Sequence, residues 1–260
     1  MTPEQIILLM EASAKQYTSL EAKFKAKGYM RERQYSDKTL LNVSDINTRW
    51  SGDKEYWKIS KTTYALDDDS EIRDETITYS FTSKRTKKLT QEPGKTPRGL
   101  IRYGDMREAV RSFYTINLVL WENCDLLWKK MHDARDMSLR YDRISHLYEL
   151  KVRMDDSLDT VHIFYIDPAK KFIPVKKELF IHNFILRELT CKKFEKVNDI
   201  WMPYEYSWAE PQQKWLENYE VQQVSVNVPI DDELLDFEFP DGTIVIDEMA
   251  NTIKKFEAIQ

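Results

Sequence analysis

Alternation of apolar and charged residues between Leu20 and Arg33 is the feature that most constrains the fold of this chain. The apolar or small positions are Leu20, Ala22, Phe24, Ala26, Gly28 and Met30, and the charged positions among them are Glu21, Lys23, Lys25, Lys27, Arg31 and Arg33. A period of two places successive side chains on opposite faces of a β-strand. The stretch therefore predicts a long antiparallel strand with one apolar face and one solvated, cationic face. Several inward residues are small, which leaves room for something else beside the sheet.

Further strand patterns follow along the chain, separated by short turn signals such as Ser51-Gly52-Asp53-Lys54 and Asp167-Pro168-Ala169-Lys170. The predicted strands are 40–50, 55–61, 72–83, 146–154, 160–166, 175–181, 184–194, 204–208, 215–228 and 243–246. Many strands joined by tight turns favour a single large curved antiparallel sheet. The alternating βα units of a parallel fold are absent from the sequence pattern.

The chain begins with a helix signal at about residues 3–16. Thr2 is a suitable N-cap, Pro3 fits the first helical position, and Gln5 completes a capping box. Apolar residues then recur at helical spacing, at Ile6, Leu9, Met10 and Ser13 or Ala14. We expect this amphipathic helix to pack on the sheet.

A second helical pattern, at about 105–134, interrupts the strands after the hydrophilic stretch 84–99. Its apolar residues at mostly helical spacing are Val110, Phe113, Tyr114, Leu118, Trp121, Leu126, Leu127 and Trp128. Helices inserted between strands must cover a sheet face or its opening, because their apolar stripes need burial. The segment therefore predicts a helical lid within a single domain that spans 1–260, since no domain linker is evident.

Composition excludes several classes of function. Lys and Arg total 39 against 44 Asp and Glu, which gives a net charge of −5, and an acidic chain disfavours nucleic acid as a partner. Only 6 of the 260 residues are glycine, about a third of the usual share, so phosphate-cradling loops and dinucleotide folds are disfavoured. No apolar run reaches the roughly 18 residues that span a bilayer.

Catalytic and metal-binding patterns are missing from the sequence. The four histidines are far apart, and only His132 with Asp136 has a helical metal-ligand spacing, for which no third ligand is evident. We therefore predict no enzyme activity, no metal and no cofactor. Cys124 and Cys191 either pair or remain two buried thiols. The basic cluster in 84–98 is either a solvated loop or a contact for anionic lipid headgroups or an acidic partner.

Three short motifs give the sequence a family resemblance. The C-terminal stretch 235–248 (LDFEFPDGTIVIDE) resembles the closing motif of LolA/LolB-like proteins, in which a phenylalanine-containing strand meets a Pro-x-Gly turn and a final valine-rich strand. Residues 161–177 are similar to the family's hairpin in which an apolar strand ends in Asp-Pro and the next begins with an aromatic-x-Pro. Residues 196–203 resemble its turn-Trp-x-Pro element.

The resemblance implies an α+β, mainly antiparallel β fold: an open, curved sheet, or unclosed barrel, with helices covering its concave side. It also implies a non-enzymatic periplasmic carrier for a lipid, a lipoprotein acyl chain or another apolar ligand. The expected partners are a lipid or acylated protein, with transient membrane or envelope-protein contact, and we expect a monomer. This chain is longer than the lipoprotein carriers, and 84–99 has no counterpart in the motifs.

The predicted ligand-binding residues combine the apolar strand face, the lid and a strand at 161–166 that is apolar on both faces. They are Leu20, Ala22, Phe24, Ala26, Trp57, Val110, Phe113, Tyr114, Ile116, Ile163 and Tyr165. The alternative is an interaction or sensor protein of the cell envelope, with the same fold and a cavity filled by its own side chains. A cavity of several hundred Å³ would distinguish the two hypotheses.

Overall fold

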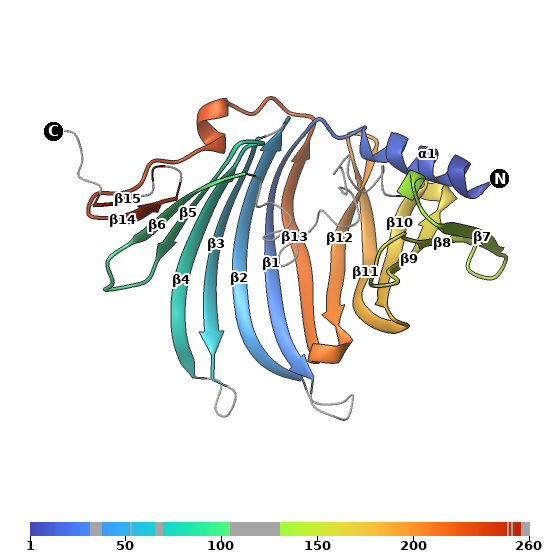
Figure 1. Ribbon diagram of the computed structural model, residues 1–260, viewed down its shortest axis with the longest axis horizontal. Coiled ribbons are helices and arrows are strands. Elements are labelled where there is room, and N and C mark those ends of the chain that lie inside the picture. The colour runs from blue at the N-terminus through green and yellow to red at the C-terminus, as the bar shows by residue number, and fades with distance from the viewer. Residues whose placement is uncertain are drawn as a thin grey trace. The chain divides into compact units, whose positions relative to one another are not determined.

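The computed structural model describes residues 1–31, 38–52, 54–65, 70–104, 131–248, 250 and 252–255. Its elements are α1 (Pro3–Ala14), β1 (Ser19–Arg31), β2 (Lys38–Ser51), β3 (Lys54–Tyr64), β4 (Glu71–Phe81), β5 (Arg85–Gln91), β6 (Arg98–Tyr103), β7 (Asp136–Asp142), β8 (Leu147–Arg153), β9 (Val161–Asp167), β10 (Ile173–Ile181), β11 (Phe184–Val197), β12 (Ile200–Glu210), β13 (Trp215–Val226), β14 (Ile244–Asp247) and β15 (Thr252–Lys255). Three short 3-10 helices, η1 (Pro168–Lys170), η2 (Pro211–Gln213) and η3 (Asp232–Leu235), complete the described elements (Figure 1).

The hydrogen-bonded strand order is β15-β14-β6-β5-β4-β3-β2-β1-β13-β12-β11-β10-β9-β8-β7. Because β15 and β7 are at opposite ends of this order, the sheet is open rather than closed into a barrel. Among the pairs whose register is defined in the described residues, only β14 with β6 is parallel. The mainly antiparallel, unclosed fold class predicted from the sequence is therefore confirmed.

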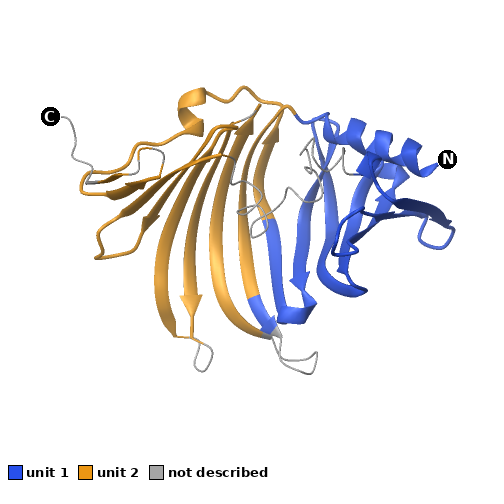
Figure 2. Ribbon diagram, in the orientation of Figure 1, with its two compact units in different colours: residues 1–17, 29–38, 114–220 blue, residues 18–28, 39–113, 221–260 orange. Residues whose placement is uncertain are grey.

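The described chain divides into two compact units whose segments alternate along the sequence (Figure 2). Unit 1 comprises 1–17, 29–38 and 114–220, and unit 2 comprises 18–28, 39–113 and 221–260. In unit 2 the strands β1 to β4 bend along their length (Figure 1). That residues 1–260 form a single domain stays a prediction.

Helix α1 forms the core of unit 1 together with β8 and β9. The Thr2 hydroxyl accepts a hydrogen bond from the Gln5 amide at 3.3 Å, and the Gln5 side chain accepts one from the Thr2 amide at 2.9 Å, as the predicted capping box requires. The buried helical residues Ile6, Ile7 and Met10 pack with Leu150, Val152, Phe164 and Ile166 of the strands. Ile7 is buried where the sequence spacing favoured Leu9, which is only half-buried.

The hydrophilic stretch 84–99 is not the loop that the sequence suggested. It forms β5, a turn, and the start of β6. Thr86 and Leu89 are buried on opposite faces of β5, and the two strands pair from Arg85 with Tyr103 to Thr90 with Arg98. Long Lys and Arg side chains lie along a sheet with their charged ends in water, so a basic composition does not prevent strand formation.

The structure of the C-terminal motif also differs from the one that the sequence predicted. Its phenylalanines, Phe237 and Phe239, do not lie in a strand but in an irregular segment that follows η3. We call residues 231–239 the strap. The final strand of the motif is present as β14, and it pairs in parallel with β6.

The predicted helical lid at 105–134 falls largely outside the described residues, which resume at 131. Met131 and His132 are helical, and Met131 is fully buried in the core with α1. The strand β7, which the sequence did not suggest, begins at Asp136.

Candidate functional site

The predicted strand face of Leu20, Ala22, Phe24 and Ala26 is present in unit 2. Each of these side chains is 1% exposed. The lysines between them, Lys23, Lys25 and Lys27, are exposed or half-buried. The burial therefore follows the period of two that the sequence predicted, and the apolar side of β1 is a core face rather than a solvated one.

The fifth predicted residue of unit 2, Trp57, contacts the same face from β3. Its ring meets that of Phe24 edge-on, with centroids 6.2 Å apart and planes at 85°. The register continues this face across β2, β3 and β4, because Ile46 pairs with Ile59 and Ile59 pairs with Ile77. We call the buried set Leu20, Ala22, Phe24, Ala26, Ile46, Trp57, Ile59, Ile77 and Phe81 the apolar face of unit 2.

One charged side chain, Glu55, is buried at the edge of this face. The Trp57 indole N–H donates a hydrogen bond of 2.7 Å to its carboxylate, and Glu55 is 1% exposed. This contact fixes the orientation of the Trp57 ring, since an indole has only one donor. Such an acceptor could equally hold a polar group of a ligand, but the indole already occupies one of its oxygens.

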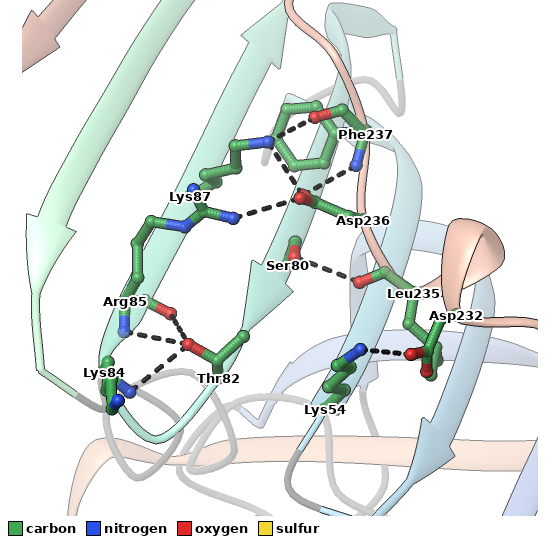
Figure 3. A network of polar contacts seen from close by, with 10 residues as sticks. All are labelled: Lys54, Ser80, Thr82, Lys84, Arg85, Lys87, Asp232, Leu235, Asp236 and Phe237. Atoms are coloured by element: carbon green, nitrogen blue, oxygen red, sulfur yellow. Dashed lines mark hydrogen bonds and ion pairs between the residues drawn. The ribbon is translucent and has the colours of Figure 1, made fainter.

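The opposite face of β4, β5 and β6 is covered by the strap (Figure 3). Ser80 donates a hydrogen bond of 3.0 Å to the carbonyl of Leu235, and Lys54 pairs with Asp232 at 2.6 Å. Further along, Phe239 packs with the buried residues Leu89 and Val245. The strap thus covers part of this face in unit 2, while the apolar face lies on the other side of the sheet.

Lys87 and Arg85, which belong to the basic cluster of the sequence, hold the strap. The Lys87 ammonium donates to Asp236 Oδ1 at 2.8 Å and to the Phe237 carbonyl at 2.6 Å, and Arg85 pairs with Asp236 Oδ2 at 3.0 Å (Figure 3). Lys95 pairs with Glu92 at 2.5 Å. Arg85 and Lys87 thus stabilise the strap, and the interpretation as a solvated loop is wrong for this part of the cluster. The other interpretation, contact with anionic lipid headgroups or an acidic partner, stays a prediction.

The strap should loosen in acid through Asp236. Burial raises the pKa of its carboxyl, but hydrogen bonds from Lys87 and from the Phe237 amide outweigh burial and hold the pKa below its usual value. A lowered folded-state pKa contributes stability above the unfolded value, about 3.9, and loses it as the pH falls through the folded value. We expect Asp236→Asn to lower stability by up to about 1 kcal/mol at pH 7, because the carboxylate is partly solvated.

Melting temperatures measured between pH 6 and pH 3 check this prediction. The wild type should lose more stability over the acid range than Asp236→Asn. Asp232→Asn is the matched control, because Asp232 is 73% exposed in its pair with Lys54 and should change the profile little. Identical acid profiles for wild type and Asp236→Asn would contradict the assignment.

Two further predicted residues, Ile163 and Tyr165, lie on β9 in unit 1 and are half-buried. Their face is opposite to the one that Phe164 and Ile166 turn to α1. The Tyr165 hydroxyl donates to Glu178 at 3.1 Å, and the Lys176 ammonium lies 5.4 Å from the Tyr165 ring centre. Lys176 also pairs with Glu178 at 2.8 Å. This row contains a buried carboxylate, Glu178, and its paired ammonium, so we leave it out of the proposed apolar site. The assignment of Ile163 and Tyr165 to a ligand site stays a prediction.

The remaining predicted lining residues, Val110, Phe113, Tyr114 and Ile116, lie outside the described residues, and their part in a site stays a prediction. Cys124 also lies outside them. Cys191 is a free thiol, and burial raises its pKa. Within the described ranges, no group of three or more His, Cys, Asp or Glu side chains is arranged to hold a metal ion. No described helix is long and apolar enough to cross a membrane.

A pocket of about 450 Å³ lies in unit 2, away from the apolar face, and sequence reasoning did not identify it. Its lining residues are Val43, Asp45, Ser60, Lys61, Thr62, Tyr64, Asp74, Glu75, Thr76, Gln91, Glu92 and Pro93. Arg73 pairs with Glu75 and Glu92 at 2.9 and 3.1 Å. Hydroxyl, amide and carboxylate groups dominate this lining, so the pocket is unsuited to an acyl chain.

Comparison with known proteins identifies the fold. No protein-family model matches the sequence, and no curated protein matches it. Among solved structures, a DUF1329 family protein from Desulfovibrio piger is similar with a TM-score of 0.54 and 10% identity, over 90% of this chain and 95% of the other. An outer membrane lipoprotein-sorting protein domain from Vibrio parahaemolyticus is similar with a TM-score of 0.53 and 12% identity, over 90% and 95%.

A LolA superfamily protein from Nitrosomonas europaea is also similar, with a TM-score of 0.51 and 9% identity, over 91% of this chain and 98% of that protein. Identities of this size show the fold and not the activity. The chain therefore has the LolA-like fold that its sequence motifs indicated.

Proposed function

We propose that this chain is a non-enzymatic carrier that holds a lipid, a lipoprotein acyl chain or another apolar ligand against the apolar face of unit 2. The observation that carries the proposal is the burial of Leu20, Ala22, Phe24 and Ala26 on one side of β1. Two of these four side chains are alanine, so this face has little side-chain bulk at the place where we propose that the acyl chain lies. The LolA-like fold supports the same assignment.

An apolar ligand can bind at such a site without any charged contact. Each buried methylene contributes roughly 0.8 kcal/mol, so an acyl chain of ordinary length that is mostly sheltered binds through the hydrophobic effect alone. The alternation of β1 keeps its lysines on the other face, where they keep the protein soluble.

The resemblance to lipoprotein carriers also supports the proposed location and partners. One similar structure is described as an outer membrane lipoprotein-sorting domain, and we accordingly propose a periplasmic protein of the cell envelope. Its partners would be a lipid or an acylated protein, with transient contact to the membrane or to an envelope protein. We propose that the carrier is monomeric.

Native mass spectrometry tests the proposal. Protein purified without detergent from a Gram-negative host should carry additional mass that organic extraction releases as acyl lipid. Ala22→Leu should lower the bound fraction several-fold, because it fills space on the apolar face. Lys23→Ala, one residue along the same strand but on its other face, should leave the fraction unchanged. A lipid-free mass together with no uptake of added monoacylglycerol would contradict the carrier function.

One observation favours a second candidate, an interaction or sensor protein whose cavity is filled by its own side chains. Phe24 and Trp57 contact each other and are each 1% exposed, so aromatic rings already occupy part of the apolar face. In that case Ala22→Leu would change neither lipid content nor ligand uptake. A pull-down of envelope proteins that is sensitive to surface substitutions would then support the second candidate.

A further inference from the structure

Unit 1 has a buried face of its own, and this face carries polar groups. The register across β8 to β13 aligns Leu150, Phe164, Lys177, Leu189, Trp208 and Glu217 in one row. The neighbouring row aligns Cys191, Tyr206 and Tyr219. Tyr206 lies two residues before Trp208 on β12, so both point to the same side of the sheet. We call Cys191, Tyr206 and Tyr219 the tyrosine row.

Tyr206 is an exception to the rule that buried polar groups are hydrogen-bonded. The residue is 1% exposed, and its hydroxyl has no hydrogen-bond partner among the described residues. Its ring is stacked on that of Tyr219, with centroids 4.6 Å apart and planes at 3°. The stacking fixes the ring, so the hydroxyl cannot turn away to find a partner elsewhere.

Tyr219 provides the contrast within the same row. Its hydroxyl donates a hydrogen bond of 2.5 Å to Glu217, and both residues are buried. The row therefore contains one tyrosine hydroxyl with a partner and one without, in nearly the same surroundings. A phenylalanine at position 206 would keep the stacking and would avoid the cost of burying an unpaired hydroxyl.

A costly polar group in a packed face is often explained by a partner that is absent from the folded chain alone. Burial, and then the neighbouring Cys191 and Glu217, raise the pKa of Tyr206 well above its usual value. The hydroxyl therefore stays protonated and can donate, and the partner that suits it is an acceptor oxygen. Because Glu217 is close by, a neutral acceptor is favoured over an anionic one.

Two apolar residues beside Tyr206 indicate the rest of the partner. Leu189 and Trp208 lie beside Tyr206 on the same face and are buried. A neutral oxygen that arrives together with apolar surface is the carbonyl of an ester or amide attached to an acyl chain. We propose that the Tyr206 hydroxyl donates a hydrogen bond to the neutral ester or amide carbonyl of an acylated ligand on this face of unit 1.

The proposal rests on the proposed carrier function, that this chain binds an acylated ligand, and it concerns a face of unit 1 in addition to the apolar face of unit 2. Two probes separate the sources of the carbonyl: monopalmitoylglycerol carries an ester, and N-palmitoylglycinamide carries an amide. Palmitate is the anionic comparison. Binding is measured by native mass spectrometry. Tyr206→Phe should bind at least one neutral probe about tenfold more weakly than wild type does, as expected for one lost hydrogen bond. Palmitate should bind wild type more weakly than that probe does.

The ligand-free proteins provide the second measurement. Tyr206→Phe should melt about 2–4 °C higher than wild type, since it removes an unpaired buried hydroxyl. Tyr219→Phe, the matched control, should melt lower because it removes a made hydrogen bond, and its probe affinity should change much less. With a carbonyl-¹³C probe, the infrared carbonyl band should lie lower on wild type than on Tyr206→Phe.

Two results would overturn the inference. If both neutral probes bind wild type and Tyr206→Phe equally, the carrier function stands and the role of Tyr206 fails. If neither probe nor palmitate binds wild type, the carrier function itself fails, and Tyr206 with it. A lower melting temperature for Tyr206→Phe would indicate that ordered water pairs with the hydroxyl, and it would also count against the proposal.

Discussion

Replacement of Trp57 by alanine is expected to lower the free energy of unfolding by about 3–5 kcal/mol. The side chain is 1% exposed, meets Phe24 edge-on, and donates its indole hydrogen to Glu55. Truncation would create a cavity at the centre of the apolar face of unit 2 and would remove the hydrogen bond to a buried carboxylate. Chemical denaturation, followed by circular dichroism, measures the loss.

Two variants separate the causes of that loss. Trp57→Phe retains most of the ring but not the donor, so it should cost about 1–3 kcal/mol, the range for an acceptor left without its partner. Tyr103→Ala is the control, because Tyr103 also belongs to a strand of unit 2 but is 65% exposed, and it should stay within about 0.5 kcal/mol of wild type. A loss below 1 kcal/mol for Trp57→Ala would mean that the apolar face is loosely packed and has room to collapse.

The parts of the fold that the sequence predicted are those in which one periodicity dominates. On β1, charged residues separate the small and apolar residues from Leu20 to Gly28, which are buried at every second position as expected. Met30, the next position of the predicted apolar face, is instead 37% exposed. Helix α1 has a local start signal in Thr2 and Gln5, and the structure retains both hydrogen bonds of the capping box. In both elements local interactions and tertiary burial favour the same conformation.

The failures occur where tertiary contacts override composition. In β5, six of seven residues are Arg, Lys, Thr or Gln without an apolar run, yet Lys87 is stabilised by Asp236, which lies far along the chain. Local propensity contains no information on that partner. Conversely, Phe237 and Phe239 have the pattern of a strand but cover the sheet as the strap, because β6 pairs with β14 instead. The pairing is parallel and non-local, so no hairpin signal precedes it.

In the candidate site, too, local patterns predicted some residues, while others depend on tertiary contacts that the sequence does not reveal. Phe24 could be assigned to the inward face from the alternation along β1, but that Trp57 of β3 shares this face follows from the packed structure, in which the two rings meet. Ile163 and Tyr165 were assigned by apolarity alone, and their face is charged because the neighbouring strand β10 contributes Lys176 and Glu178. Tyr206 could not be found at all from the sequence, because the lack of a partner for a hydroxyl is a property of the packed structure.

The close approach of the strap to β6 depends on Gly99. A Cβ atom at this position would lie 2.6 Å from Phe239 Cε1 and 2.7 Å from Val245 Cγ2, both closer than packed carbon atoms come. Gly99 is buried, and it pairs with Leu89 on β5 and with Val245 on β14. The absent side chain therefore allows β14 and Phe239 to meet over the same point of the sheet.

Gly99→Val is accordingly expected to destabilise unit 2 by about 1–3 kcal/mol or more through overpacking, and to expose the strap. Hydrogen exchange of the amides in 232–247 should rise in this variant. Phe239→Ala alone should cost about 3–5 kcal/mol, but it opens the space that valine needs. The double variant should therefore be less destabilised than the sum of the two single variants, by about 0.5–3 kcal/mol. Strict additivity, or unchanged exchange in the strap of Gly99→Val, would show that Phe239 does not lie against Gly99 in solution.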